Sequence, residues 1–135
     1  MNILVLDGQG GKMGRQLIER ISAAFPDYII TAVGTNSVAT STMIKGGAKY
    51  AATGENAVLA ASRKADVIIG SVGIVIADSL VGEISPKMAA AVGQSDAFKI
   101  LIPTNRCNNL VAGIGNQTMG ELLDDVIKKL SALSG

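Results

Sequence analysis

The sequence contains no histidine and no tryptophan, and its only cysteine is Cys107. Without histidine, one chain can form neither a serine triad nor a histidine general base. The single cysteine excludes an intrachain disulfide, and the missing histidine also excludes a zinc site of cysteine and histidine ligands. Aromatic residues make up only 3% of the chain, so the core must consist of aliphatic side chains and methionine. The remaining chemistry belongs to backbone amides, carboxylates, lysines and arginines.

The chain also lacks an excess of charge of either sign. Its 12 basic and 11 acidic residues give a formal net charge of +1, and no basic run is longer than two residues. Proteins that bind nucleic acids normally show a basic stripe and aromatic stacking platforms. We therefore expect no nucleic-acid partner.

Long hydrophobic segments are missing as well. The most apolar stretch, residues 67–77, is too short to cross a membrane. The N-terminus has no signal-peptide pattern, so we expect a cytoplasmic protein without a membrane partner. The mean hydropathy of +0.39 is nevertheless high for a small soluble chain. Because large exposed apolar patches are usually interfaces, this surplus predicts a homo-oligomer.

Short β-branched runs alternate along the chain with segments of helical period. Strands are predicted at 2–7, 28–33, 66–70 and 98–102, and helices at 13–25, 38–45, 55–64, 87–92 and from 118 onward. The ranges 48–52 and 109–115 are candidates for edge strands, and 73–83 fits neither period. This alternation predicts one α/β domain over 1–135, a three-layer Rossmann-like doubly wound parallel sheet of about five strands. We expect the C-terminal helix to pack on the sheet, with a dimer seam as the alternative.

A glycine-rich segment lies directly between the first predicted strand and the first predicted helix. Glycines let the backbone approach a phosphate closely, and the helix that follows directs its free amides at that phosphate. We predict that this segment binds a nucleotide or another phosphate-bearing ligand, although a strict G-x-G-x-x-G pattern is broken by Met13. In the alternative interpretation the protein is a scaffold or regulator, and the glycines only close a tight turn. The predicted binding residues are Gly8, Gln9, Gly10, Gly11, Lys12, Met13 and Gly14.

Further candidate residues follow the other predicted strands, because ligands of open α/β sheets bind beyond the carboxyl ends of the strands. They are Thr35 and Asn36, Ser71 and Gly73, and Asn105 and Arg106. The second strand is not followed by the acidic residue that usually binds the ribose of NAD. NADP and NAD both remain candidate cofactors, with NADP slightly favoured; Thr35 and Asn36 are equally well explained as a turn and a helix cap. Arg106 is suited to hold an anion, or else pairs with Asp78 or Glu83.

Other groups offer limited chemistry. Asp7 directly precedes the loop, and we expect it to brace the loop by accepting amide hydrogen bonds; the alternative is a Mg²⁺ ligand in a small phosphate-transfer enzyme. Cys107 has no histidine base, which disfavours a nucleophilic role. Asp78, Ser79 and Glu83 are candidates for a lid or for part of a partner's site. No catalytic residue and no metal site are assigned, and whether the protein is an enzyme is left open.

Residues 5–18, VLDGQGGKMGRQLI, resemble the nucleotide-binding loop of dihydrodipicolinate reductases. The motif of that family would fall on Gly8, Gly11, Met13 and Gly14, and the resemblance implies a Rossmann domain that binds the pyrophosphate of NADH or NADPH. It does not extend to the reductase activity, because this chain lacks the histidine-rich segment and the second domain. Over its whole length, the chain resembles a group of short, uncharacterised bacterial proteins through residues 73–86 and 100–109. That resemblance implies the same fold and no assigned activity.

Overall fold

The computed structural model describes residues 1–104 and 108–134. Its centre is a five-stranded sheet in the order β3-β2-β1-β4-β5, with parallel pairing throughout. The strands are β1 (Asn2–Asp7), β2 (Ile29–Gly34), β3 (Tyr50–Thr53), β4 (Val67–Ser71) and β5 (Phe98–Ile102). The chain proceeds outward from β1 to β3, then crosses to β4 on the other side of β1. The predicted doubly wound sheet is confirmed.

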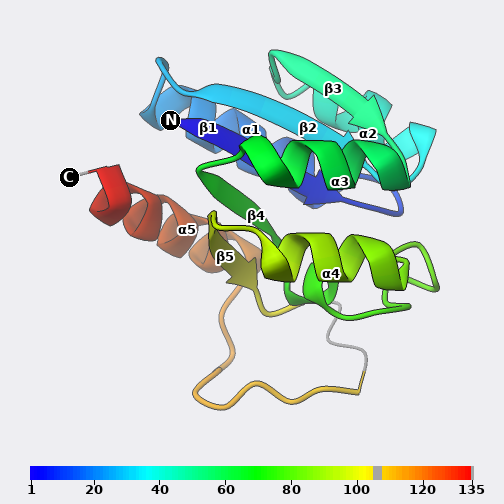
Figure 1. Ribbon diagram of the computed structural model, residues 1–135. Coiled ribbons are helices and arrows are strands. Elements are labelled where there is room, and N and C mark those ends of the chain that lie inside the picture. Colours follow the sequence, from blue (N-terminus) through cyan, green and yellow to red (C-terminus); the bar gives the residue numbers. More distant parts are fainter. Residues whose placement is uncertain (105–107, 135) are drawn as a thin grey trace.

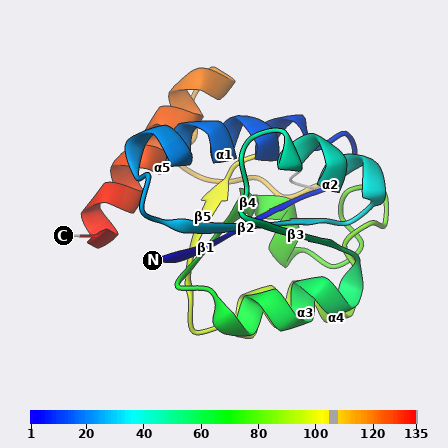
Figure 2. The same cartoon turned by 90° about the horizontal axis from the view of Figure 1, so that it is seen from above.

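Helices cover both faces of the sheet, as Figures 1 and 2 show. One face carries α1 (Lys12–Ala24), α2 (Ser37–Ile44) and α5 (Met119–Ser134), and the other carries α3 (Glu55–Lys64) and α4 (Pro86–Gln94). The C-terminal helix packs on the sheet, as predicted. Among the described residues, no helix has the length and apolar content needed to cross a membrane.

Local signals in the sequence explain where several helices begin. The Ser85 hydroxyl accepts a hydrogen bond from the amide of Met88, and Pro86 occupies the first turn of α4. Before α5, Thr118 and Glu121 each accept the other's backbone amide with their side chains. This reciprocal capping box satisfies amides that the helix leaves without partners.

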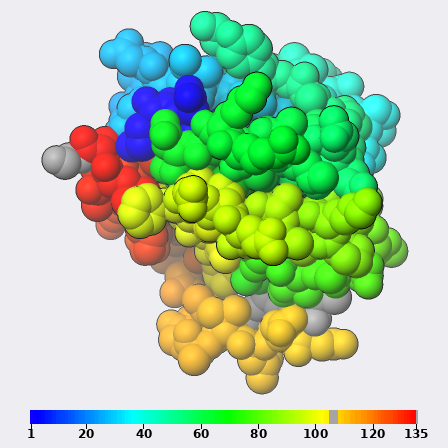
Figure 3. Space-filling view, viewed as in Figure 1, coloured from blue at the N-terminus to red at the C-terminus, as the bar shows by residue number. Residues whose placement is uncertain are grey.

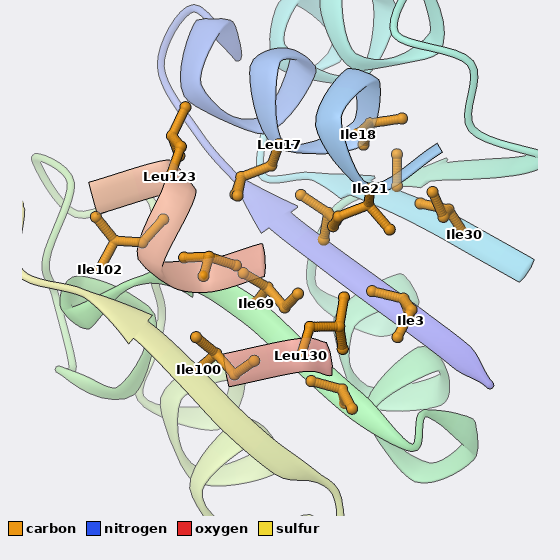
Figure 4. Close-up of a cluster of buried hydrophobic side chains, with 14 of the residues drawn as sticks. Ile3, Leu17, Ile18, Ile21, Ile30, Ile69, Ile100, Ile102, Leu123 and Leu130 are labelled. Atoms are coloured by element: carbon orange, nitrogen blue, oxygen red, sulfur yellow. The ribbon is translucent and has the colours of Figure 1, made fainter. Parts of the chain in front are cut away.

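The core forms two layers, one on each side of the sheet. Successive strand residues point to opposite faces, so Ile3 faces α1 and α5 whereas Leu4 faces α3 and α4. Figure 4 shows the first layer, in which Leu17 and Ile21 of α1 and Leu123 and Leu130 of α5 pack over the sheet. Because both faces are covered, the central strands consist of continuous apolar runs.

The segments without a clear period have different outcomes. Residues 50–53 form the edge strand β3, close to the predicted 48–52. The expectation of an edge strand at 109–115 is wrong, because none of these residues belongs to a strand of the sheet and Leu110 is 95% exposed. Gly113, with a φ of +85° and no described residue within 4 Å of its Cβ position, favours a loop there. The orange segment in Figures 1 and 3 projects away from the sheet before α5 begins.

One part of the sheet is left open beside α3. A groove of about 450 Å³ runs along β2 and β3, lined by Ile29, Thr31 and Tyr50 and by alanines of α3. No residue of the glycine-rich loop lines this groove. It is therefore separate from the site described next.

Candidate functional site

The glycine-rich loop connects β1 to α1 at the point where the strand order reverses. β1 lies between β2 and β4, and the chain continues from β1 to one side and later returns to the other. In open α/β sheets, ligands bind at the carboxyl edge at such a switch point. The fold thus brings the predicted loop to the position where a ligand is expected.

Asp7 holds the two ends of this loop together. Its Oδ1 accepts a hydrogen bond from the amide of Gly8, and its Oδ2 accepts one from the amide of Gly14, each at 2.8 Å. The side chain is buried, and this burial raises the pKa of Asp7 although the two amide bonds act in the opposite direction; the negative charge of Glu83 adds to the increase. Since a loop amide occupies each carboxylate oxygen, the geometry favours the bracing role over a Mg²⁺ ligand.

Two of the glycines are required where the loop meets α2. Gly11 has a φ of +75°, and a Cβ there would lie 2.5 Å from the carbonyl oxygen of Ala39. A Cβ on Gly14 would lie 2.5 Å from the sulfur of Met43. Gly10 differs from both, because no described residue lies within 4 Å of its Cβ position. The inner glycines therefore serve packing, whereas Gly10 faces open space.

Three amides at or just before the start of α1 are available to a ligand. Among the described residues, the N–H groups of Gly10, Lys12 and Met13 have no acceptor within the chain. The first amides of a helix lack intrahelical partners, and the helix dipole favours an anion beside them. The side chain of Lys12 is exposed at the same place. This arrangement is suited to a phosphate group.

Glu83, which the sequence suggested as part of a lid or of a partner's site, or as an ion-pair partner of Arg106, lies against the loop itself. Its Oε1 accepts hydrogen bonds from the Gln9 amide at 2.8 Å, the Thr35 hydroxyl at 2.5 Å and the Asn36 side-chain amide at 3.1 Å. Desolvation acts to raise the pKa of Glu83, but these three hydrogen bonds together hold it below its usual range. An acidic group therefore stands at the end of β2 after all, although it comes from a distant part of the chain.

The segment that carries Glu83 is a compact left-handed turn, which explains why it fits neither helical nor strand period. Asp78, Leu80 and Val81 have φ between +56° and +65°, and Gly82 follows at +86°. Such values are uncommon outside glycine, especially for a β-branched residue. The buried Ser79 donates its hydroxyl to the carbonyl of Gly73, and the Leu80 side chain is also buried. Packing therefore holds this turn in place.

The remaining predicted residues differ in what they contact, and some lie outside the described residues. Asn36 caps α2, since its Oδ1 accepts from the amide of Ala39 at 2.8 Å, and its amide group also donates to the Gln9 carbonyl at 3.0 Å. The helix-cap interpretation of Asn36 is thus confirmed. Ser71 and Gly73 are both buried, and the Gly73 carbonyl is engaged by Ser79. Asn105, Arg106 and Cys107 lie outside the described residues, and so does the proposed pairing of Arg106.

Glu83 was missed because its partners are far away in the sequence. It is 48 residues from Thr35 and 74 from Gln9. The sequence offered one signal, an acidic side chain in an apolar segment immediately before the helix that begins at Pro86. That signal does not indicate which strand end the side chain reaches.

A parallel sheet of this order with a glycine-rich loop at its switch point defines a Rossmann-like protein. Within that class, the chain belongs to the family described as "Domain of unknown function (DUF3842)", whose model matches residues 2–134. No curated protein matches the chain.

Among solved structures, the chain is similar to a dodecameric FMN-dependent UbiX-like decarboxylase from Escherichia coli O157:H7. The two share 14% sequence identity over 98% of this chain and 94% of the other, with a TM-score of 0.45. A likeness of this extent brings neither a ligand nor an assembly to this chain. The resemblance of the loop to dihydrodipicolinate reductases is not shown by these matches.

Proposed function

We propose that this protein is a single nucleotide-binding domain, which holds a nucleotide or another phosphate-bearing small molecule at Gly8–Gly14. One observation carries the proposal: Asp7 fixes both ends of the loop, and the amides of Gly10, Lys12 and Met13, at or just before the start of α1, have no acceptor among the described residues. NADP and NAD are the candidate cofactors. The cytoplasmic location and the homo-oligomer stay predictions from composition.

The chemistry of the site favours binding over catalysis. The chain has no histidine, and Asp7 is engaged by two loop amides. We therefore expect a proton donor or acceptor for chemistry on a bound nucleotide to come from a substrate or from another protein. The proposal assigns a binding role and no catalytic residue.

A scaffold without a nucleotide is the second candidate function. It is favoured by the fact that two of the chain's own carboxylates, Asp7 and Glu83, already occupy amides of the loop. In such a protein the loop would only join β1 to α1, and the remaining amides would be satisfied by water.

A thermal-shift titration separates the two functions. The ligands are NAD, NADP, ATP, FMN and inorganic pyrophosphate, each raised to millimolar concentration. A ligand present at a hundred times its dissociation constant adds about 2.7 kcal/mol to the free energy of unfolding, which raises the midpoint visibly. The absence of a shift with all five would support the scaffold.

The variant Gly10→Val tests whether the ligand occupies the loop. The Cβ of residue 10 has open space, so the fold should persist while the new side chain obstructs the amides. Gly93→Val is the matched control, since Gly93 lies in α4 and its Cβ position is equally open. We expect the shift to disappear in Gly10→Val and to remain in Gly93→Val. A shift retained in Gly10→Val would place the ligand elsewhere.

A further inference from the structure

We infer that Glu83 determines specificity by accepting the hydroxyls of a free ribose diol, so that the site prefers nucleotides with an unmodified ribose to those with a 2′-phosphate. The inference rests on the proposed function, because it needs a nucleotide bound at Gly8–Gly14. It names the chemical class of that nucleotide. It also reverses the slight preference for NADP that Thr35 and Asn36 suggested by themselves.

Glu83 lies where a ribose-binding carboxylate is expected, at the end of β2. In nucleotide-binding sheets of this topology, an acidic residue at the end of the second strand binds the ribose hydroxyls. Here β2 ends at Gly34 and is followed by Thr35 and Asn36, which carry no charge. Both of these side chains donate hydrogen bonds to Glu83. The connection between β4 and α4 thus supplies the carboxylate that β2 lacks.

The two carboxylate oxygens of Glu83 differ in their hydrogen bonds. Three donors converge on Oε1, whereas no described residue donates a hydrogen bond to Oε2. The residue is only partly buried. One oxygen therefore fixes the orientation of the group, and among the described residues the other has no donor, so we assign it to ligand hydroxyls.

The turn that carries Glu83 is rigidly held. Backbone hydrogen bonds close the turn around Glu83: Asp78 donates to Ile84 at 2.7 Å, Ile84 donates to Ser79 at 3.2 Å, and Glu83 donates to Leu80 at 3.1 Å. Left-handed residues other than glycine persist only where the surroundings hold them, and they are often found at ligand sites. Glu83 is thus held against the loop in advance of binding, with little freedom to move aside.

The negative charge of Glu83 also favours a free ribose over a 2′-phosphate. The hydrogen bonds at Oε1 hold the pKa of Glu83 below its usual range, so the group is ionised at neutral pH. An ionised carboxylate accepts hydroxyl protons and repels a phosphate at the same place. Glu83 engages the Gln9 amide, whereas the amides of Gly10 and Met13 have no acceptor among the described residues and stay available to a phosphate. Phosphate and ribose therefore have separate places on one loop.

The decisive variant is Glu83→Gln, in which the side-chain carbonyl can still accept from Gln9, Thr35 and Asn36 while the charge is lost. Isothermal titration with NAD, NADP, AMP, 2′-deoxy-AMP and inorganic pyrophosphate compares it with the unaltered protein. We expect the unaltered protein to bind NAD about tenfold more tightly than NADP, and AMP about tenfold more tightly than 2′-deoxy-AMP. In Glu83→Gln both ratios should approach one, with the affinity for pyrophosphate unchanged.

Two further variants keep the result interpretable. Glu19→Gln makes the same charge change on the exposed side of α1 and should leave both ratios as they are. Thr35→Val removes one donor to Oε1 and should reduce the ratios by a smaller factor, which provides a test if Glu83→Gln does not fold.

The outcomes are distinct. Equal binding of NAD and NADP by the unaltered protein, or ratios that do not change in Glu83→Gln, would overturn the role of Glu83 and leave the proposed function standing. If neither pyrophosphate nor any nucleotide binds, both the proposed function and this inference fail.

Discussion

The two sides of the glycine-rich loop obey different requirements. On the inner side, Gly11 and Gly14 lie against α2 and Asp7 ties the loop ends together. On the outer side, no described residue lies near the Cβ position of Gly10, and Glu83 is partly exposed with one oxygen that accepts from no described residue. The inner side is needed to build the fold, and the outer side is available for binding. Substitutions on the two sides should therefore affect different measurements.

The largest difference in unfolding free energy is expected between substitutions of the adjacent residues Gly10 and Gly11. Gly11→Val combines a left-handed φ with a Cβ 2.5 Å from a backbone oxygen, so we expect a loss of about 3 kcal/mol or more in unfolding free energy. Gly10→Val should change that free energy by less than about 1 kcal/mol. Chemical denaturation of both variants measures the contrast. Equal losses would show that the outer side is also part of the packed structure.

Substitution of Asp7, the carboxylate on the inner side of the loop, should have an intermediate effect on stability. Asp7→Asn leaves one loop amide facing the NH₂ group of the new side chain, so one buried donor loses its acceptor at a cost of about 1–3 kcal/mol. Asp66→Asn is the control, because Asp66 accepts the amide of Asn2 at an exposed position. Thermal and chemical unfolding should show a smaller loss for Asp66→Asn. A smaller loss for Asp7→Asn would contradict the bracing role.

The smallest effect is the pH dependence of stability, which should have opposite signs for Asp7 and Glu83. The folded pKa of Glu83 is lowered from 4.5, so its contribution to stability is present above that value and disappears as the pH falls through the folded pKa. The folded pKa of Asp7 is raised from 3.8, so stability is lost as the pH rises from that value through the folded pKa.

Unfolding free energies between pH 3 and pH 7, measured for the unaltered protein, Asp7→Asn and Glu83→Gln, check these signs. The advantage of the unaltered protein over Glu83→Gln should shrink toward low pH. Relative to Asp7→Asn, the unaltered protein should lose stability as the pH rises through the Asp7 titration. The same sign for both pairs would remove the distinction between the two sides of the loop.

Much of the fold could be predicted because its signals are local. The apolar run at 2–7 indicated a strand buried on both faces, and the capping residues Ser85 and Thr118 indicated the starts of two helices. Asp7 and the glycines of the loop are neighbours in the sequence, so their relation could also be inferred. Residues 109–115 were wrongly predicted, because a short β-branched pattern does not show whether a partner strand is present.

The composition and the local patterns by themselves determined the order of strands and helices, the aliphatic core and the place of the glycine-rich loop. They did so because periodicity, capping and turn residues act over a few positions along the chain. Only the tertiary structure decided that the acidic group at the end of β2 comes from residue 83. That contact joins residues 48 positions apart through a left-handed turn, and its geometry depends on the packing of Ser79 and Leu80.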